Sequence, residues 1–214
     1  MQTIIQKCTM SVKNIYNEFD ASHDFDHIVR VLKNAQQIAG TIPHADVSII
    51  TLAVLLHDIE DPKYQSVSAH SVSQILSQAG ADEQTIETVQ KTINSVSFNG
   101  GNERDITSIE GAIVRDADRL DAMGAIGIAR TFAFGGARGR KLYDAEEVTR
   151  KDMSEAEYRS KETSSVTHFF EKLLLLKERM VTDEGKRLAE QRHTFMVTFL
   201  QQLSDETDLA LDTR

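Results

Sequence analysis

The spacing of apolar residues is the feature that most limits what this chain can fold into. Apolar side chains recur three or four positions apart over most of its length, whereas alternating apolar and polar stretches are scarce. Prolines, which interrupt helices, occur at two positions, Pro43 and Pro62. This spacing is typical of helices that bury one face, so we expect an all-α fold.

Capping residues predict where several helices begin and end. Ser22 can cap a helix that Gly40 ends, and Asp46 can cap the next one. Because a residue before proline avoids helical backbone, this second helix should end near Asp61. Further helices are expected over about 66–78, 82–95, 108–132 and 154–203, the last broken near Gly185, with loops over 99–104 and 135–141.

Length and composition favour one ordinary globular domain. Of the 214 residues, 40% are hydrophobic and 27% are charged, which suffices for a sizeable core. No repeat, low-complexity tract or linker is found. We therefore predict a single domain over 1–214, in which a C-terminal helical extension (about 154–214) packs on the rest. The apolar stripes over 169–180 and 195–203 fit either this core or the surface of a homodimer.

The sequence argues against several classes of protein. No apolar run approaches the ~20 residues of a membrane span, and the N-terminal sequence lacks the features of a signal peptide. A single cysteine, Cys8, cannot form an internal disulfide, which agrees with a reducing, cytoplasmic location. The net charge of −9 argues against long nucleic acid as a partner. A bound cation can still make one pocket attractive to a small phosphorylated substrate.

Ionisable residues on three of the expected apolar helices indicate a metal site. His27 lies on the apolar face of the first helix, and the His57-Asp58 pair ends the apolar run LAVLLHD. Asp118 lies within the apolar segment IVRDADRLDAMGAIGIA. Burying such groups costs free energy, so each is expected to have a partner. Two imidazoles and two carboxylates suit one divalent ion (Mn²⁺, Ni²⁺, Co²⁺, Fe²⁺, Mg²⁺ or Zn²⁺), which can orient a phosphate and lower the pKa of an attacking water.

The segments that hold these residues resemble the signature of the HD-domain superfamily, an all-α group of metal-dependent phosphohydrolases. They read HDFDHIVRV over 23–31, LLHDIED over 55–61 and DADRLDAMGAIGIARTF over 116–132. The last segment and the tail THFFEKLLLLKERMVTDEGKRLAEQR are similar to the bacterial YedJ/YpgQ-like branch. The resemblance covers most of the chain and implies an HD-domain helical bundle. It places the metal ligands at His27, His57, Asp58 and Asp118.

The resemblance also selects among the aspartates near the last ligand. In the superfamily this ligand precedes one residue and then a leucine, and Ala117-Asp118-Arg119-Leu120 fits that frame. Asp121 lies one turn further and is expected near the substrate or a bound water. The extra histidine ligands of two-metal relatives have no matching pattern here, so one ion is expected.

Two acidic residues after the HD pair are candidates for moving a proton. In a continuing helix Asp61 shares the face of His57 and Asp58, and a carboxylate near a cation stays ionised, which suits a base. Glu60 is the second candidate. The guanosine tetraphosphate hydrolases of the superfamily carry a Glu-Asp pair one residue later, which argues against that substrate. A solvated helix end is the alternative for both residues.

Further residues are candidates for binding an anionic substrate. His23, four before His27, is expected on the same helix face, and Lys63 can reach a phosphate from the rim. Arg138 and Arg140 follow two glycines in ARTFAFGGARGRK, a composition that suits a loop closing over an anion. A tolerant surface loop has the same composition.

Together these features predict a metal-dependent hydrolase that cleaves a phosphoester or phosphoanhydride in a nucleotide-like small molecule. The branch that the chain resembles implies (deoxy)nucleoside triphosphate pyrophosphohydrolysis as the sharper prediction. Three alternatives stay open. They are a 5′-nucleotidase or phosphodiesterase on the same site, a non-catalytic regulatory or binding protein stabilised by its metal, and a di-iron oxygenase.

Overall fold

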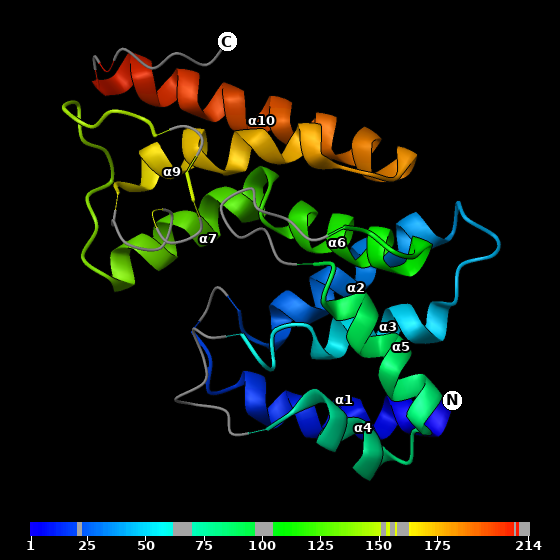
Figure 1. Cartoon of the computed structure of the whole chain (residues 1–214). Helices are drawn as coiled ribbons and strands as arrows, with labels where there is room; N and C mark the ends of the chain where they lie inside the picture. The colour runs from blue at the N-terminus through cyan, green and yellow to red at the C-terminus, as the bar shows by residue number, and fades with distance from the viewer. Residues whose placement is uncertain are drawn as a thin grey trace. The chain divides into compact units, whose positions relative to one another are not determined.

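The computed structural model describes residues 1–20, 23–61, 70–96, 105–150, 153, 154, 157, 163–207 and 209. Within these ranges every regular element is a helix and no strand occurs, so the predicted all-α fold is confirmed (Figure 1). None of the helices described there is long and apolar enough to cross a membrane. The elements are α1 (Gln2–Tyr16), α2 (Phe25–Ala39), α3 (Val47–Leu56), α4 (Val72–Ala79), α5 (Glu83–Ile93), α6 (Ile109–Asp121), α7 (Gly124–Ala137), α9 (Ser165–Glu171), the 3-10 helix η3 (Leu173–Arg179) and α10 (Asp183–Thr207).

The chain forms two compact units whose boundary falls within α6. The first unit contains residues 1–97 and 103–118, and the second unit contains 98–102 and 119–214. All four predicted metal ligands belong to the first unit. The single domain with a C-terminal extension stays a prediction.

Helix α3 forms the centre of the first unit. Its sequence VSIITLAVLL is apolar on every side, and most of its residues are buried. It packs against α1, α2 and α5, and α4 packs against α1 and α5. A helix that is hydrophobic all round needs neighbours on every side. His57 and Asp58, the two residues that follow α3, therefore lie inside this unit.

Three predicted helix boundaries are confirmed. Asp46 caps α3, Asp82 caps α5, and α2 ends at Gly40. Both aspartates accept backbone N–H groups of the first turn at 2.8 to 3.1 Å. These N–H groups have no partner within a helix, which is why a short acidic residue before an apolar run identifies a helix start.

Two helix starts differ from the prediction. Helix α2 begins after Asp24, whose carboxylate accepts the N–H of His27 and caps the helix; the predicted cap, Ser22, lies outside the described residues. Helix α4 begins after Ser71 rather than near residue 66, because Ser71 forms a capping box with the first turn. In both cases a polar residue closer to the apolar run provides the cap.

The helix predicted over 108–132 is two helices in the structure. Helix α6 ends at Asp121, and α7 starts at Gly124, whose φ of +68° lies in the left-handed region that favours glycine. A second glycine permits close packing at the same place, because a Cβ on Gly127 would lie 2.3 Å from the carbonyl oxygen of Ala122. The two glycines turn the chain where apolar spacing alone predicts a continuous helix.

The predicted C-terminal helical segment is divided into α9, η3 and α10. The break expected near Gly185 lies between η3 and α10. Gly185 is in the first turn of α10, where its N–H donates to Thr182 Oγ1 at 3.0 Å and so is capped. Helix α7 continues to Ala137, so the loop predicted over 135–141 begins inside a helix. The loop predicted over 99–104 lies outside the described residues.

A cluster of phenylalanine rings holds the second unit together. Phe132 of α7, Phe169 of α9 and Phe199 of α10 have ring centroids 5.8 to 6.1 Å apart. The two C-terminal apolar stripes therefore contribute to a core, although Phe195 is 53% exposed. A homodimer stays a prediction.

Candidate metal centre

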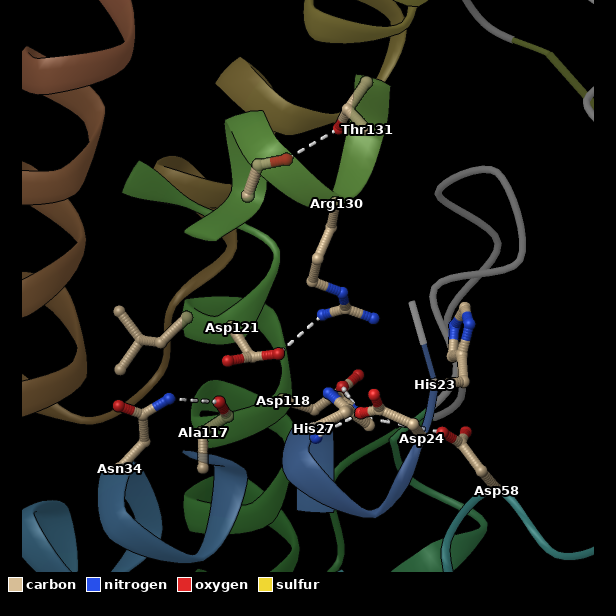
Figure 2. Close-up of polar contacts among 12 residues, drawn as sticks. His23, Asp24, His27, Asn34, Asp58, Ala117, Asp118, Asp121, Arg130 and Thr131 are labelled. Atoms are coloured by element: carbon tan, nitrogen blue, oxygen red, sulfur yellow. Dashed lines mark hydrogen bonds and ion pairs between the residues drawn. The ribbon is translucent and has the colours of Figure 1, made fainter. Parts of the chain in front are cut away.

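Helix α2 presents His27 from its first turn. The Asp24 carboxylate accepts the N–H of His27 at 3.0 Å and so fixes the backbone there. The His27 side chain is fully buried, which confirms that it faces inward. Its imidazole lies beside the carboxylates of Asp58 and Asp118 (Figure 2).

His57 and Asp58 lie in a turn after α3, because this helix ends at Leu56 and not near Asp61 as predicted. The Nδ1 atom of His57 donates a hydrogen bond to the carbonyl oxygen of Val54 at 2.9 Å. In a continuing helix that carbonyl accepts the N–H of Asp58. The bond therefore replaces a helical one, and it leaves the lone pair of His57 Nε2 available for a ligand.

Asp118 is carried by α6, which a buried hydrogen bond joins to α2. Asn34 Nδ2 donates to the carbonyl oxygen of Ala117 at 3.0 Å (Figure 2). Asn34 lies two helical turns after His27, on the same face of α2. The contact therefore fixes the position of Asp118 relative to His27.

Four side-chain atoms converge in the first unit. The Nε2 atoms of His27 and His57 are 3.5 Å apart. Asp58 Oδ2 lies 3.5 and 3.4 Å from them, and Asp118 Oδ1 lies 3.6 and 3.7 Å from them. Four ligands about 2.1 Å from one ion, in tetrahedral arrangement, lie about 3.4 Å apart. The spacing of His27, His57 and Asp118 therefore fits one divalent cation, and Asp58 lies at a comparable distance from both imidazoles.

Burial and charge act in opposite directions on these groups. Burial disfavours a charged imidazole, but the carboxylates of Asp58 and Asp118 raise the pKa of His57 from 6.5 to about 10. Partial burial acts to raise the pKa of the two carboxyl groups, whose side chains are 13% and 32% exposed, but the facing histidines hold the pKa of Asp58 and of Asp118 well below the ordinary range. In the metal-free protein this raised pKa keeps His57 protonated near neutral pH, so a divalent cation that bound at His57 would have to displace that proton.

Metal affinity is expected to increase with pH. Because His57 has to lose its proton to become a ligand, binding of one Mn²⁺ should release about one proton per chain, and the apparent affinity should rise about tenfold per pH unit below the pKa of His57. Isothermal titration calorimetry between pH 6 and 8.5, in buffers of different ionisation enthalpy, measures both quantities. An affinity that does not change over this range would contradict the expectation.

The stability of the metal-free protein should have the opposite pH dependence. The raised pKa of His57 stabilises the fold fully below pH 6.5, and this contribution is lost as the pH rises through about 10. The lowered pKa of Asp58 stabilises the fold above 3.8, and this contribution is lost at lower pH. Thermal unfolding with a chelator present should therefore show the highest melting temperature between about pH 3.8 and pH 6.5, where both contributions are present.

Glu60 and Asp61, the predicted proton-transfer residues, make hydrogen bonds that involve backbone groups. Glu60 Oε1 accepts the N–H of Val72 at 2.9 Å and so satisfies a backbone donor at the start of α4. Asp61 lies directly after the turn, and its N–H donates to the carbonyl oxygen of Asp58 at 3.1 Å. Lys63 lies outside the described residues.

His23 precedes α2 and does not lie on the helix, which corrects the prediction that it shares a helical face with His27. The cause is the cap at Asp24: the helix begins at Phe25, two residues after His23. The His23 ring nevertheless contacts the His27 ring edge-on, with centroids 5.7 Å apart. His23 Nδ1 lies 3.7 Å from the carboxylate of Asp20.

The remaining predicted residues belong to the second unit. Asp121 is buried, and its carboxylate forms an ion pair of 2.7 Å with Arg130 (Figure 2). The Arg138 guanidinium stacks on the Phe134 ring at 3.5 Å from its centroid, and that of Arg140 lies at 5.3 Å. The roles of Asp121, Arg138 and Arg140 toward a substrate stay predictions.

The groups that hold the ligands in place are not anticipated by the sequence analysis. Asn34 is a polar residue on the apolar face of a predicted helix, and this signal could have identified it. The Val54 carbonyl group, which orients His57, belongs to the backbone and has no signature in the sequence.

Comparison with known proteins adds to this geometry. The model of the HD domain family matches residues 24–123. The chain is 38% identical to the protein YpgQ of Bacillus subtilis over 200 residues, which cover 91% of this chain and 89% of YpgQ. The crystal structure of YpgQ in complex with ADP has a TM-score of 0.76 at 34% identity and covers 96% of this chain and 95% of that one.

Two further crystal structures are similar over nearly the whole chain. A Lactobacillus plantarum protein has a TM-score of 0.86 at 30% identity, with 96% of this chain and 97% of that chain covered. A protein of Bacillus thuringiensis described as an HD-superfamily hydrolase has a TM-score of 0.71 at 37% identity, with 97% and 98% covered.

Proposed function

The chain belongs to the HD-domain family, and on this premise we propose that it is a metal-dependent phosphohydrolase acting on nucleotides. The sharper proposal is that it cleaves nucleoside or deoxynucleoside triphosphates to the monophosphate and pyrophosphate. In this reaction water attacks the α-phosphorus, and the bond from that phosphorus to the oxygen bridging to the β-phosphate breaks.

One observation carries the proposal: two imidazole nitrogens lie 3.5 Å apart in the first unit, and one oxygen of each of two carboxylates lies 3.4 to 3.7 Å from both of them. We propose that His27, His57, Asp58 and Asp118 hold one divalent ion. The ion, when bound, supplies Lewis-acid chemistry toward a phosphate oxygen and the attacking water.

The residues of the chain supply orientation and proton transfer. The hydrogen bond from His57 Nδ1 to Val54 keeps the ligating nitrogen directed at the centre. Asp61 is proposed to accept the proton of the attacking water at a carboxylate oxygen. Glu60 is the weaker candidate for this role, because its carboxylate already satisfies the N–H of Val72.

The nucleotide as substrate is supported by the relative YpgQ, whose crystal structure contains ADP. The choice of a triphosphate and of pyrophosphate release is supported by the resemblance of 116–132 and of the C-terminal segment to the YedJ/YpgQ-like branch. No residue described above selects a base or a sugar.

The test is to incubate the purified protein and Mn²⁺ with nucleoside mono-, di- and triphosphates, and to measure phosphate and pyrophosphate separately. We expect pyrophosphate from triphosphates, no hydrolysis of monophosphates, and no activity with a chelator or with Asp118→Ala. Release of phosphate from monophosphates would instead identify a 5′-nucleotidase. Absence of hydrolysis with every divalent ion would contradict the enzymatic function itself.

A further inference from the structure

The ring of Phe134, in the last turn of α7, contacts two arginine side chains. The guanidinium carbon of Arg138 lies 3.5 Å from the ring centroid, and that of Arg140 lies 5.3 Å from it. At 3.5 Å a planar guanidinium is stacked flat on the ring, so its N–H groups, which lie in its plane, are directed past the ring and not into it. Arg138 is exposed, whereas Phe134 and Arg140 are half-buried. One aromatic ring therefore holds two cations at the surface of the second unit.

The backbone that carries the two arginines is a defined helix end. The N–H of Arg140 donates to the Gly135 carbonyl oxygen at 2.9 Å, and the N–H of Gly139 donates to the Gly136 carbonyl oxygen at 3.2 Å. These two bonds form the Schellman motif, which ends a helix and requires one residue with left-handed backbone. Gly139 is that residue, with a φ of +67°. The turn therefore fixes the positions from which both arginine side chains extend.

Helix α9 holds this turn from the other side. A Cβ atom on Gly135 would lie 2.3 Å from Ser165 Oγ, so α7 approaches α9 closely at this glycine. The N–H of Ser165 also donates to the carbonyl oxygen of Lys141, directly after the turn, at 3.0 Å. Because both ends of the turn are held in this way, the two guanidinium groups are positioned before any ligand binds.

The charge of this segment is opposite to that of the whole chain. The chain has a net charge of −9, but RTFAFGGARGRK over 130–141 contains four basic residues and no acidic one. The guanidinium carbons of Arg138 and Arg140 are about 9 Å apart at most, because both lie near one ring centroid, and like charges at this separation repel each other. An aromatic face attracts a cation without neutralising it. The arrangement therefore favours an anion that contacts both groups.

We propose that Phe134, Arg138 and Arg140 form a preorganised anion site on the second unit, which binds the phosphate chain of a nucleotide or free pyrophosphate. A guanidinium offers phosphate oxygens pairs of N–H donors, and a chain of linked phosphates presents oxygens to both groups at once. Because the ring and the turn already hold the side chains, little conformational freedom is lost on binding. The class of ligand rests on the proposed function, whereas the site itself uses none of the metal ligands.

The test is isothermal titration calorimetry of the metal-free protein with inorganic pyrophosphate and, separately, with ATP. Without a divalent ion the metal centre offers an anion no bound cation, so binding reports on the anion site. Arg138→Gln and Arg140→Gln should each lower the affinity about 10-fold or more, the loss expected for one charge-assisted hydrogen bond. Lys186→Gln and Arg187→Gln, which remove exposed charges at the start of α10 in the same unit, are the matched controls and should change the affinity less than about twofold.

A second pair of variants tests the turn while both arginines stay in place. Gly139→Ala puts a side chain on left-handed backbone, and because no atom lies within 4 Å of the added Cβ, only the backbone is strained. The affinity for pyrophosphate should fall about 5-fold, because alanine disfavours this backbone and the turn then moves the arginines away from the ring. Gly136→Ala adds the same atom, also with nothing within 4 Å, at a residue without positive φ, and should leave the affinity unchanged.

The outcomes separate this inference from the proposed function. If pyrophosphate and ATP bind equally well to the wild type and to both arginine variants, or do not bind to the wild type, the anion site is wrong and metal-dependent hydrolysis stands. If both variants lower the melting temperature but not the affinity, the arginines only stabilise the end of α7 and the proposal is overturned. If the variants lose binding but the wild type hydrolyses no nucleotide with any divalent ion, the anion site is supported and the proposed function is wrong.

The two titrations also distinguish the sources of the phosphate chain. An affinity for ATP at least about tenfold above that for pyrophosphate, lowered by Arg138→Gln and Arg140→Gln, supports a nucleotide as the ligand. Equal affinities, lowered by the same variants, support recognition of the linked phosphates alone and thus free pyrophosphate.

Discussion

Hydrolysis by His57→Ala is expected to fall on the order of 10³-fold or more, because even groups that only orient metal ligands cost 10- to 100-fold when they are removed. The substitution deletes a ligating nitrogen and also the hydrogen bond to the Val54 carbonyl that ends α3. Initial rates with Mn²⁺ and a nucleoside triphosphate measure the effect, and circular dichroism establishes that the variant is folded.

His44→Ala is the matched control for this prediction. His44 is exposed, lies before α3 and contacts none of the converging atoms, so its replacement should leave the rate unchanged. Hydrolysis by His57→Ala within tenfold of the wild type would show that the reaction takes place elsewhere in the protein.

Asp121→Ala is expected to destabilise the second unit by about 3 kcal/mol, because it leaves a largely buried cation without its partner. The Asp121 carboxylate lies 2.7 Å from Arg130 Nη1, and the two side chains are 3% and 15% exposed. Chemical denaturation, followed by circular dichroism, gives the change in the free energy of unfolding. Replacing both residues by apolar ones, as in Asp121→Leu with Arg130→Met, should cost less than the single change.

An exposed ion pair in the same unit gives the comparison. Lys141 Nζ lies 2.6 Å from the Asp144 carboxylate, but the lysine side chain is 71% exposed. Lys141→Ala should therefore cost much less stability than Asp121→Ala. If Asp121→Ala and Lys141→Ala lowered the free energy of unfolding equally, burial would not determine the strength of the ion pair between Asp121 and Arg130.

Those parts of the fold that depend on local interactions could be predicted from the sequence. The aspartates at 46 and 82 cap helices because they satisfy backbone N–H groups three residues away or fewer. The break between α6 and α7 could not be predicted in this way, since apolar residues continue through it. It depends on the positive φ of Gly124 and on the close approach of Gly127 to Ala122, which involve tertiary packing.

The candidate site shows the same division. His27 and Asp58 could be identified because ionisable groups at apolar helix positions require a reason. The hydrogen bond from Asn34 to the Ala117 carbonyl group was not identified, because it joins residues 83 positions apart in the sequence. The end of α3 at Leu56 depends on a side-chain hydrogen bond to a backbone carbonyl, and the proline at 62 indicates a later end.

The most direct test of the central claim is the metal content of the protein after dialysis against Mn²⁺, measured by elemental analysis for the wild type and for Asp118→Asn. Four ligands that converge on one ion predict one Mn²⁺ per chain in the wild type. The variant, in which an amide of the same shape replaces one carboxylate, should contain clearly less Mn²⁺. Two ions per chain, or one ion retained at equal affinity by Asp118→Asn, would contradict a single metal centre built from His27, His57, Asp58 and Asp118.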